Sequence, residues 1–139
     1  MNKQKTKSQS LRPTEVELEI LDVLWQIGPS AMGKIHEACT AARPSAPGYT
    51  TTQKMVQVMR DKGLIEVDKS IRPPLYRAAE LRERTRLNLL DDVTQRAFGG
   101  SAKSLVLSLL DGDRLNKEEL SEVKALIAKA EKTQTNPSS

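Results

Sequence analysis

Residues 49–79 read YTTTQKMVQVMRDKGLIEVDKSIRPPLYRAA, and a change of hydrophobic period inside this stretch decides the fold. From about Thr50 to Lys62 the core-type side chains recur at helical spacing, and Gly63 is well suited to end a helix. The face expected to be buried consists of Thr52, Met55, Val56 and Met59, with Val58 at its margin. The opposite face is polar and consists of Thr50, Gln53, Lys54, Gln57, Arg60 and Asp61. The segment is therefore predicted to be an amphipathic helix with a polar outer face.

Beyond this helix the sequence is typical of a β-hairpin. Residues 64–67 and 75–78 are short segments rich in β-branched or aromatic side chains, which predicts two strands. The link at 68–74 is basic and ends in two prolines, which cannot continue a strand ladder. A polar-faced helix is therefore followed by a hairpin with a basic tip.

Upstream, residues 13–27 predict a helix that is apolar around much of its circumference and belongs at the centre of a small core. Its start has two interpretations. Either Pro13 is the first helical residue and Arg12 occupies the N-cap, or the helix begins later with Thr14 as its cap and Glu17 completing a capping box.

A second helix is expected over about 31–42, with Ser30 as its cap and Gly28-Pro29 ending the helix before it. The segment 43–48 has the composition of a turn and leads into the helix at 50–62. Residues 11–79 thus predict three helices followed by a hairpin.

Residues 80–131 are predicted to be helical throughout, at about 80–97, 102–111 and 116–131. Each helix has an apolar stripe, and three short helices cannot bury these stripes against one another alone. A second copy of the chain is therefore expected to complete the core. The side chains expected in this dimer contact are Leu87, Leu90, Val93, Leu105, Leu109, Leu120, Val123 and Ile127.

The net charge of +4 lies entirely within residues 1–79, while residues 80–139 carry equal numbers of acidic and basic side chains. This asymmetry suggests two roles, one of which faces a polyanion. A single Cys excludes a disulfide framework, and no apolar run is long enough to span a membrane. The sequence predicts a cytoplasmic protein with disordered tails at 1–10 and 132–139.

The helix at 50–62 has the side chains needed to read DNA. A B-DNA major groove admits one helix, and Gln, Lys and Thr can contact base edges or the thymine methyl group there. The expected base-reading residues are Thr50, Thr51, Gln53 and Lys54, and the expected phosphate contacts are Arg12, Arg60, Lys69 and Arg72. An ordinary solvated helix face is the competing interpretation. The preceding helix and the basic hairpin tip favour the DNA reader.

Several segments, in this order and spacing, carry a family resemblance. They are Leu11 with EVELEILDVLW at 15–25, YTTT at 49–52, DKGLI at 61–65, Tyr76, AFGGS at 97–101 and SLVL at 104–107. On these segments the chain resembles the BlaI/MecI/CopY family of bacterial transcriptional repressors over about residues 11–130. The resemblance implies an N-terminal winged helix over 11–79, which reads a palindromic operator, and a helical dimerisation region over 80–131. It also assigns Thr50, Thr51, Gln53 and Lys54 to the groove-reading turn.

Three departures from the family pattern affect this expectation. Arg12 stands where the family has a Ser or Thr helix cap, which is either a lost cap or a further phosphate contact. A signal-activated protease cuts the resistance-linked members at an Asn–Phe bond, whose matching positions here are Ser108 and Leu109. The copper-responsive members use paired Cys near the C-terminus, and this sequence has none there.

No motif for catalysis or cofactor binding is visible. His36 and Cys39 are three residues apart on a predicted helix, but a zinc site needs three or four ligands and no partner pair has ligand spacing. The acidic run Glu15, Glu17 and Glu19 is expected to be solvated at a helix start.

Two other functions remain open for the same elements: a protein-interaction adaptor, and an architectural DNA binder without sequence preference. The varied hydrogen-bonding side chains of the helix at 50–62 argue against the latter, because charge neutralisation alone does not need them.

Overall fold

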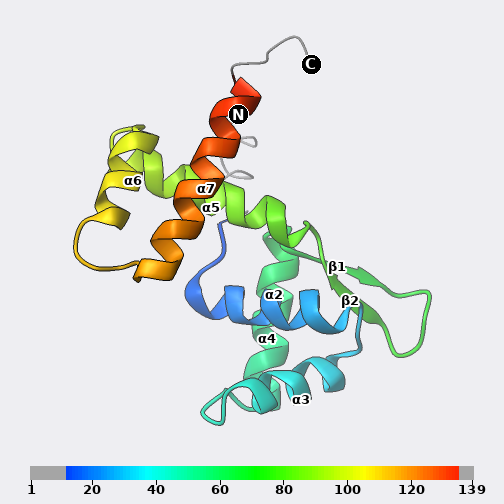
Figure 1. The fold of residues 1–139 in the computed structure, drawn as a ribbon. Coiled ribbons are helices and arrows are strands. Elements are labelled where there is room, and N and C mark those ends of the chain that lie inside the picture. Colours follow the sequence, from blue (N-terminus) through cyan, green and yellow to red (C-terminus); the bar gives the residue numbers. More distant parts are fainter. Residues whose placement is uncertain (1–11, 135–139) are drawn as a thin grey trace. The chain divides into compact units, whose positions relative to one another are not determined.

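The computed structural model describes residues 12–134 (Figure 1). The chain divides into two compact units between Leu90 and Asp91. The fold is mostly helical with one antiparallel hairpin, as predicted. The elements of the first unit are α2 (Glu15–Ile27), α3 (Met32–Ala42), α4 (Tyr49–Asp61), β1 (Ile65–Asp68), β2 (Leu75–Ala78) and the start of α5 (Arg82–Ala97). The boundary expected at residue 79 stays a prediction.

Helix α2 begins at Glu15 with Thr14 as its N-cap, which is the later of the two expected starts. The Thr14 hydroxyl accepts the backbone N–H of Glu17 at 3.2 Å, and the Glu17 carboxylate accepts the backbone N–H of Thr14 at 2.9 Å. This capping box satisfies two donors that the helix itself cannot pair. The start at Pro13 with Arg12 as N-cap is therefore wrong, and Arg12 does not mark a lost cap.

Ser30 pairs with the hairpin instead of capping α3. Its backbone N–H donates to the carbonyl of Tyr76 at 2.9 Å, and its backbone carbonyl accepts the N–H of Tyr76 at 2.8 Å. Its hydroxyl donates to the Gly28 carbonyl at 2.8 Å. Helix α3 begins at Met32 with Ala31 at the N-cap, so the expected Ser30 cap is wrong.

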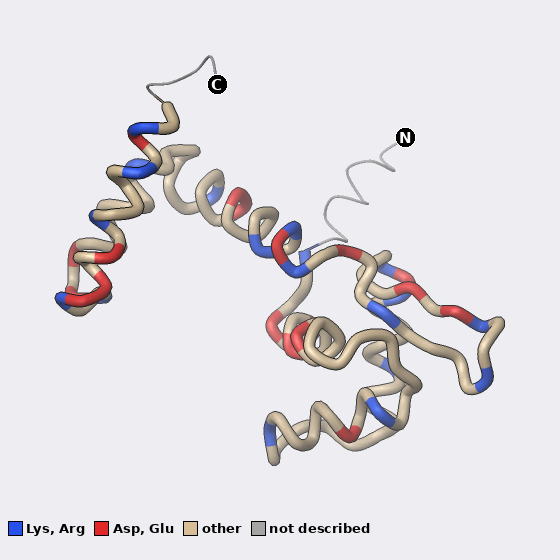
Figure 2. Tube along the Cα trace, turned by 45° about the vertical axis from the view of Figure 1, so that its right-hand side comes forward, with Lys and Arg blue, Asp and Glu red and all other residues tan. Residues whose placement is uncertain are grey.

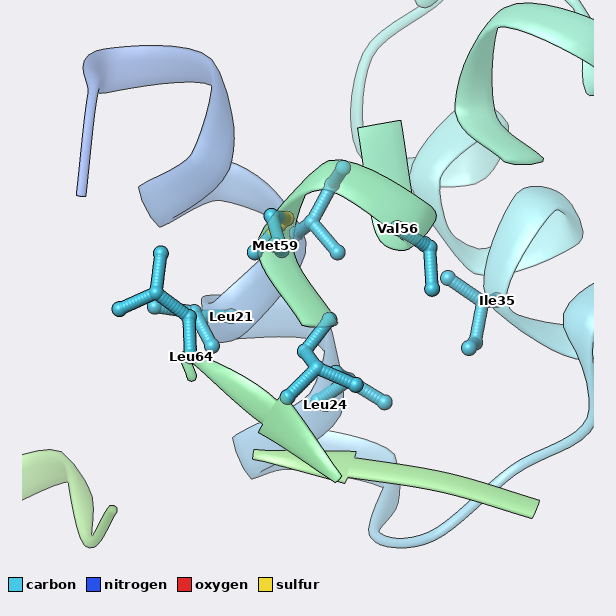
Figure 3. Packing of buried hydrophobic residues seen from close by; sticks show 8 residues of the cluster. Leu21, Leu24, Ile35, Val56, Met59 and Leu64 are labelled. Atoms are coloured by element: carbon cyan, nitrogen blue, oxygen red, sulfur yellow. The ribbon is translucent and has the colours of Figure 1, made fainter. Parts of the chain in front are cut away.

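The hydrophobic core of the first unit gathers side chains from α2, α3, α4 and β1. Figure 3 shows six of them meeting: Leu21, Leu24, Ile35, Val56, Met59 and Leu64. The predicted inner face of α4 is confirmed, since Thr52, Val56 and Met59 are buried and Met55 is half-buried. Burial of this face fixes which side of α4 points to solvent.

Gly63 ends α4 in a left-handed conformation, with φ of +86°. The N–H of Leu64 donates to the carbonyl of Met59 at 2.8 Å, and the N–H of Gly63 donates to that of Arg60 at 3.0 Å. This pair of bonds is the Schellman motif, which turns the chain directly into β1.

The hairpin strands pair from Ile65 opposite Ala78 to Asp68 opposite Leu75. Past β2, the Trp25 indole N–H donates to the carbonyl of Glu80 at 3.0 Å. This hydrogen bond ties α2 to the residues that lead into α5.

The second unit contains the end of α5, α6 (Ala102–Leu110) and α7 (Lys117–Gln134). Asn116 and Glu119 form the capping hydrogen bonds of α7, at 2.8 and 3.1 Å. Helix α7 continues through residues 132–134, so that part of the expected disordered tail is wrong. Residues 1–11 and 135–139, which include the rest of both tails, lie outside the described residues. None of the helices within residues 12–134 combines the length and the hydropathy of a membrane-spanning segment.

Candidate nucleic-acid interface

The outer face of α4 is the first part of the candidate interface. Thr50, Thr51, Gln53 and Lys54 are all exposed, in the first turn and a half of the helix. Gly48 occupies the N-cap and supplies no side-chain cap. The first intrahelical bond runs from the N–H of Thr52 to the carbonyl of Gly48, so the amides of residues 49–51 precede the helical ladder. These amides form a partial positive charge at the helix start.

The cations expected to contact phosphate lie in three places. Lys69 and Arg72 are exposed in the loop between β1 and β2, and Figure 2 marks the cations at this tip. Arg60 is partly exposed near the end of α4, and Arg12 is partly exposed just before α2. Helix α4 packs against β1, so the exposed face of α4 and the basic hairpin tip belong to the same compact unit.

The hairpin tip has its own local order. The backbone N–H of Ser70 donates to the Asp68 carboxylate at 2.9 Å, and the Ser70 hydroxyl donates to the same oxygen. These hydrogen bonds lower the pKa of Asp68. Ile71 follows with 42% of its surface exposed, between Ser70 and Arg72. Sequence reasoning missed Ile71, although an apolar residue within a basic loop was a visible signal.

Glu17 is buried, which corrects the expectation that the acidic run of α2 is solvated. Only 4% of Glu17 is exposed, and its carboxylate accepts the Lys62 ammonium at 2.7 Å. Burial by itself raises the pKa of a carboxyl group, but the hydrogen bonds from Lys62 and Thr14 outweigh it, so the pKa of Glu17 lies below its ordinary value. This ion pair joins the start of α2 to the C-cap of α4 and helps to hold the candidate reading helix.

His36 and Cys39 do not come together with further ligands. The His36 ring packs edge-to-face on Tyr49, the first residue of α4, with ring centroids 5.5 Å apart. Cys39 is half-buried, and burial raises the pKa of its thiol. Within residues 12–134 no group of three or more His, Cys, Asp or Glu side chains could hold a metal ion.

The residues expected in a dimer contact lie on α5, α6 and α7. Within residues 91–134 no side chain is buried. Among the eight expected residues, Leu105 and Val123 are partly exposed, and the other six are exposed by 41–55%. Ser108 and Leu109, the positions that match the family cleavage bond, are exposed on α6.

Three helices followed by a hairpin, with a polar helix face and a basic loop on one block, define a winged-helix protein. The penicillinase repressor family matches residues 13–129, and the chain belongs to this family. It is thus a DNA-binding transcriptional regulator, a class of protein that is not an enzyme class.

One solved structure that is similar to the chain comes from Mycobacterium bovis. It is the homodimeric winged helix-turn-helix DNA-binding domain of a possible ArsR-family transcriptional regulator. The two chains are 24% identical with a TM-score of 0.47, over 71% of this chain and 85% of that chain. No curated protein matches the chain.

Proposed function

We propose that the protein is a homodimeric repressor that binds a palindromic operator with α4 in the major groove. The observation that carries this proposal is the exposed polar start of α4, where the side chains of Thr50, Thr51, Gln53 and Lys54 are all open to solvent. A regulator of this fold needs a reading helix with an outer face of this kind.

Base reading is assigned to Thr50, Thr51, Gln53 and Lys54. The Gln53 amide can both donate and accept, which suits bidentate contact with the N6 and N7 edge of adenine. Thr50 and Thr51 offer methyl groups to thymine and hydroxyls to either partner. The Gln and Thr side chains distinguish one base pair from another. Lys54 donates hydrogen bonds to base edges and also adds electrostatic attraction to the DNA.

Phosphate contact is assigned to Arg12, Arg60, Lys69 and Arg72. Lys69 and Arg72 lie in the hairpin tip, which we place on the DNA backbone or in the DNA minor groove next to α4. The exposed Ile71 between them would meet the apolar sugar wall of a minor groove.

Dimerisation is assigned to α5, α6 and α7. Their exposed Leu, Val and Ile side chains need an apolar partner, and an identical chain offers the same stripes in return. In such a dimer the two α4 helices would enter successive major grooves about 34 Å apart. The operator is accordingly expected to have half-sites one helical turn apart.

Cleavage by an antirepressor protease is not part of the proposal. The positions that match the family cleavage bond hold Ser108 and Leu109 in place of Asn and Phe, so the recognised bond is absent.

The test is the selection of bound duplexes from a random pool by the full chain, at about 0.15 M salt, where non-specific attraction is partly screened. A recovered palindrome with half-sites one turn apart is the expected result. Binding without any enriched motif would support an architectural DNA binder instead. Absence of binding would support a protein-interaction adaptor.

A further inference from the structure

A hollow of about 270 Å³ lies inside the first unit, between α2, α3, α4 and the 43–48 loop. Its floor includes Ile20, Val23 and Thr52, all of which are buried. Its walls are largely apolar side chains of α2, α4 and the loop, among them Val16, Pro47 and Met55. A small, mostly apolar cavity with a few polar groups at its edge is the usual form of a small-molecule site.

The polar groups of this hollow favour a cation. Glu19, Asp22 and Arg43 are its charged lining residues, so carboxylates outnumber guanidinium groups. Arg43 is paired with Glu19 at 2.8 Å. Asp22 is exposed, and no cation among residues 12–134 lies within ion-pair distance of it. An ammonium group at this edge would therefore meet an uncompensated carboxylate.

A second observation agrees with this electrostatic character. The thiol of Cys39 lines the hollow, and its pKa is raised first by burial and then by the negative charge of Glu19, which together outweigh the opposing effect of Arg43. Burial disfavours a charge of either sign, whereas the Glu19 carboxylate disfavours negative charge in particular, so both effects oppose an anionic ligand. A carboxylate or phosphate compound is thus a poor candidate for this hollow.

We propose that the hollow between α2, α3 and α4 binds a small amphipathic organic cation. The apolar body of the ligand packs on Ile20, Val23 and Met55, and its ammonium group lies at Asp22 and Glu19. The ligand class is defined by these two requirements together: a compact hydrocarbon part and one positive charge.

The position of the hollow links it to the reading helix. Thr52 and Met55 line it from the inner face of α4, while Thr51 and Gln53 lie on the outer face of the same turn. The loop that carries Arg43 and Pro47 leads directly to the N-cap Gly48. A bound ammonium competes with Arg43 for Glu19 and moves this loop, so the ligand is expected to lower operator affinity. This coupling rests on the proposed function, whereas ligand binding itself does not.

Binding is tested first without DNA, on the ¹⁵N-labelled full chain, with three probes that share one hydrocarbon body. The probes are n-hexylammonium, 1-hexanol and hexanoate. We expect n-hexylammonium to shift the amide resonances of Val23, Thr52 and Met55 at the lowest concentration, and hexanoate to shift them least. Equal affinity of hexanol and hexylammonium would overturn the cationic class, and no shift with any probe would overturn the site.

Two substitutions on adjacent residues locate the site. Ala42→Leu places a larger side chain into the hollow, whereas Ala41→Leu adds the same atoms to a different depression on α3. Hexylammonium binding should be lost in the first variant and retained in the second. The unfolding midpoint of both variants is measured, and loss of binding in a folded Ala41→Leu protein would contradict the location.

The charge requirement has its own variant, Asp22→Asn, at an exposed position. It should weaken hexylammonium binding about threefold to fivefold, as for an exposed ion pair, and leave hexanol binding unchanged. An equal loss for both probes would show that Asp22 shapes the hollow and does not select the charge.

The coupling to DNA is measured with the operator recovered by selection. Hexylammonium should raise the Kd for the operator in the original chain and in Ala41→Leu but not in Ala42→Leu, with methylammonium chloride controlling for ionic strength. Unchanged operator affinity despite probe binding would overturn the coupling. If no operator is recovered, the proposed function fails and the NMR result for the site still stands.

Discussion

At the scale of single residues, Glu17 has the most consequential environment. One carboxylate oxygen accepts the backbone N–H of Thr14 and the other accepts the ammonium of Lys62. The first contact is local, while the second spans 45 residues of sequence. Glu17 therefore does two jobs with one side chain: it caps α2 and it anchors the end of α4.

Replacement of Glu17 by Gln should lower the free energy of unfolding by about 2 kcal/mol, because it removes one partner of a charged pair that is largely shielded from water. The matched control is Glu66→Gln, which breaks an exposed pair with Arg77 and should cost less than about 1 kcal/mol. Urea unfolding of the three proteins measures both differences. Equal losses in the two variants would contradict the role of burial.

The same pair predicts a pH dependence. Because the pKa of Glu17 is lowered on folding, its stabilisation is fully present above the unfolded value and is lost as the pH falls through the folded value. The stability gap between the original protein and Glu17→Gln should accordingly be full at neutral pH and narrow below about pH 4. Urea unfolding of both proteins, repeated from neutral pH to below about pH 4, measures this difference in stability.

Gln53 is the residue on which sequence specificity depends most in the proposed complex. Gln53→Ala should cost about 1–3 kcal/mol on the selected operator and much less on a scrambled duplex, because it removes a base contact. Fluorescence anisotropy with both duplexes gives the ratio of the Kd for the scrambled duplex to the Kd for the operator. Gln26→Ala, an exposed Gln on α2, serves as the control. An unchanged ratio in Gln53→Ala would remove this residue from base reading.

At the scale of elements, helix faces could be predicted and contacts between distant segments could not. The inner face of α4 follows from spacing within the helix, so Thr52, Val56 and Met59 were identified correctly. The sequence offers Glu17 as the capping-box partner of Thr14, but its ion pair with Lys62, 45 residues away, could not be predicted. Ser30 has the composition of a cap, but its backbone is taken by Tyr76. The DNA-reading and dimer residues stay predictions.

The end of α4 gives a test in which one substitution has opposite effects at two sites. Gly63→Ala should destabilise the protein by about 1–2 kcal/mol, because the residue has φ of +86°. Gly33→Ala lies within α3 with no atom close to the added methyl group, and should stabilise by about 0.5 kcal/mol. Thermal unfolding measures the change in Tm of each variant. Changes in the same direction for both variants would contradict the explanation.

The hairpin tip predicts an effect that does not depend on base sequence. Arg72→Ala should weaken binding to all duplexes by a similar factor and lower the slope of log K against log salt by about one, because one phosphate contact is lost. Titrations at several salt concentrations measure the slope. If the slope were unaltered, the tip would not contact phosphate in the complex.

At the scale of the whole molecule, the two units have unequal cores. The first unit buries a cluster drawn from three helices and a strand, whereas residues 91–134 bury no side chain. Exposed apolar stripes on short helices are costly in water, so a subunit contact is the natural way to cover them.

This difference leads to a prediction about assembly. Ile127→Gln places a polar side chain within the apolar stripe of α7 and should shift the protein from dimer to monomer, with a parallel loss of operator affinity. Ala125→Gln, on the opposite side of the same helix by its spacing, should leave the dimer intact. Sedimentation velocity distinguishes the species. A dimer that survives Ile127→Gln would place the subunit contact elsewhere.

Trp25 is the only indole in the sequence, and its N–H is held by the carbonyl of Glu80 just before α5 begins. Its fluorescence therefore reports one defined junction, where the helix that leads from the first unit into the second starts. Loss of that hydrogen bond would change the polarity around the ring and shift its emission. The protein thus carries its own optical label at this junction, and no added dye is needed to follow it.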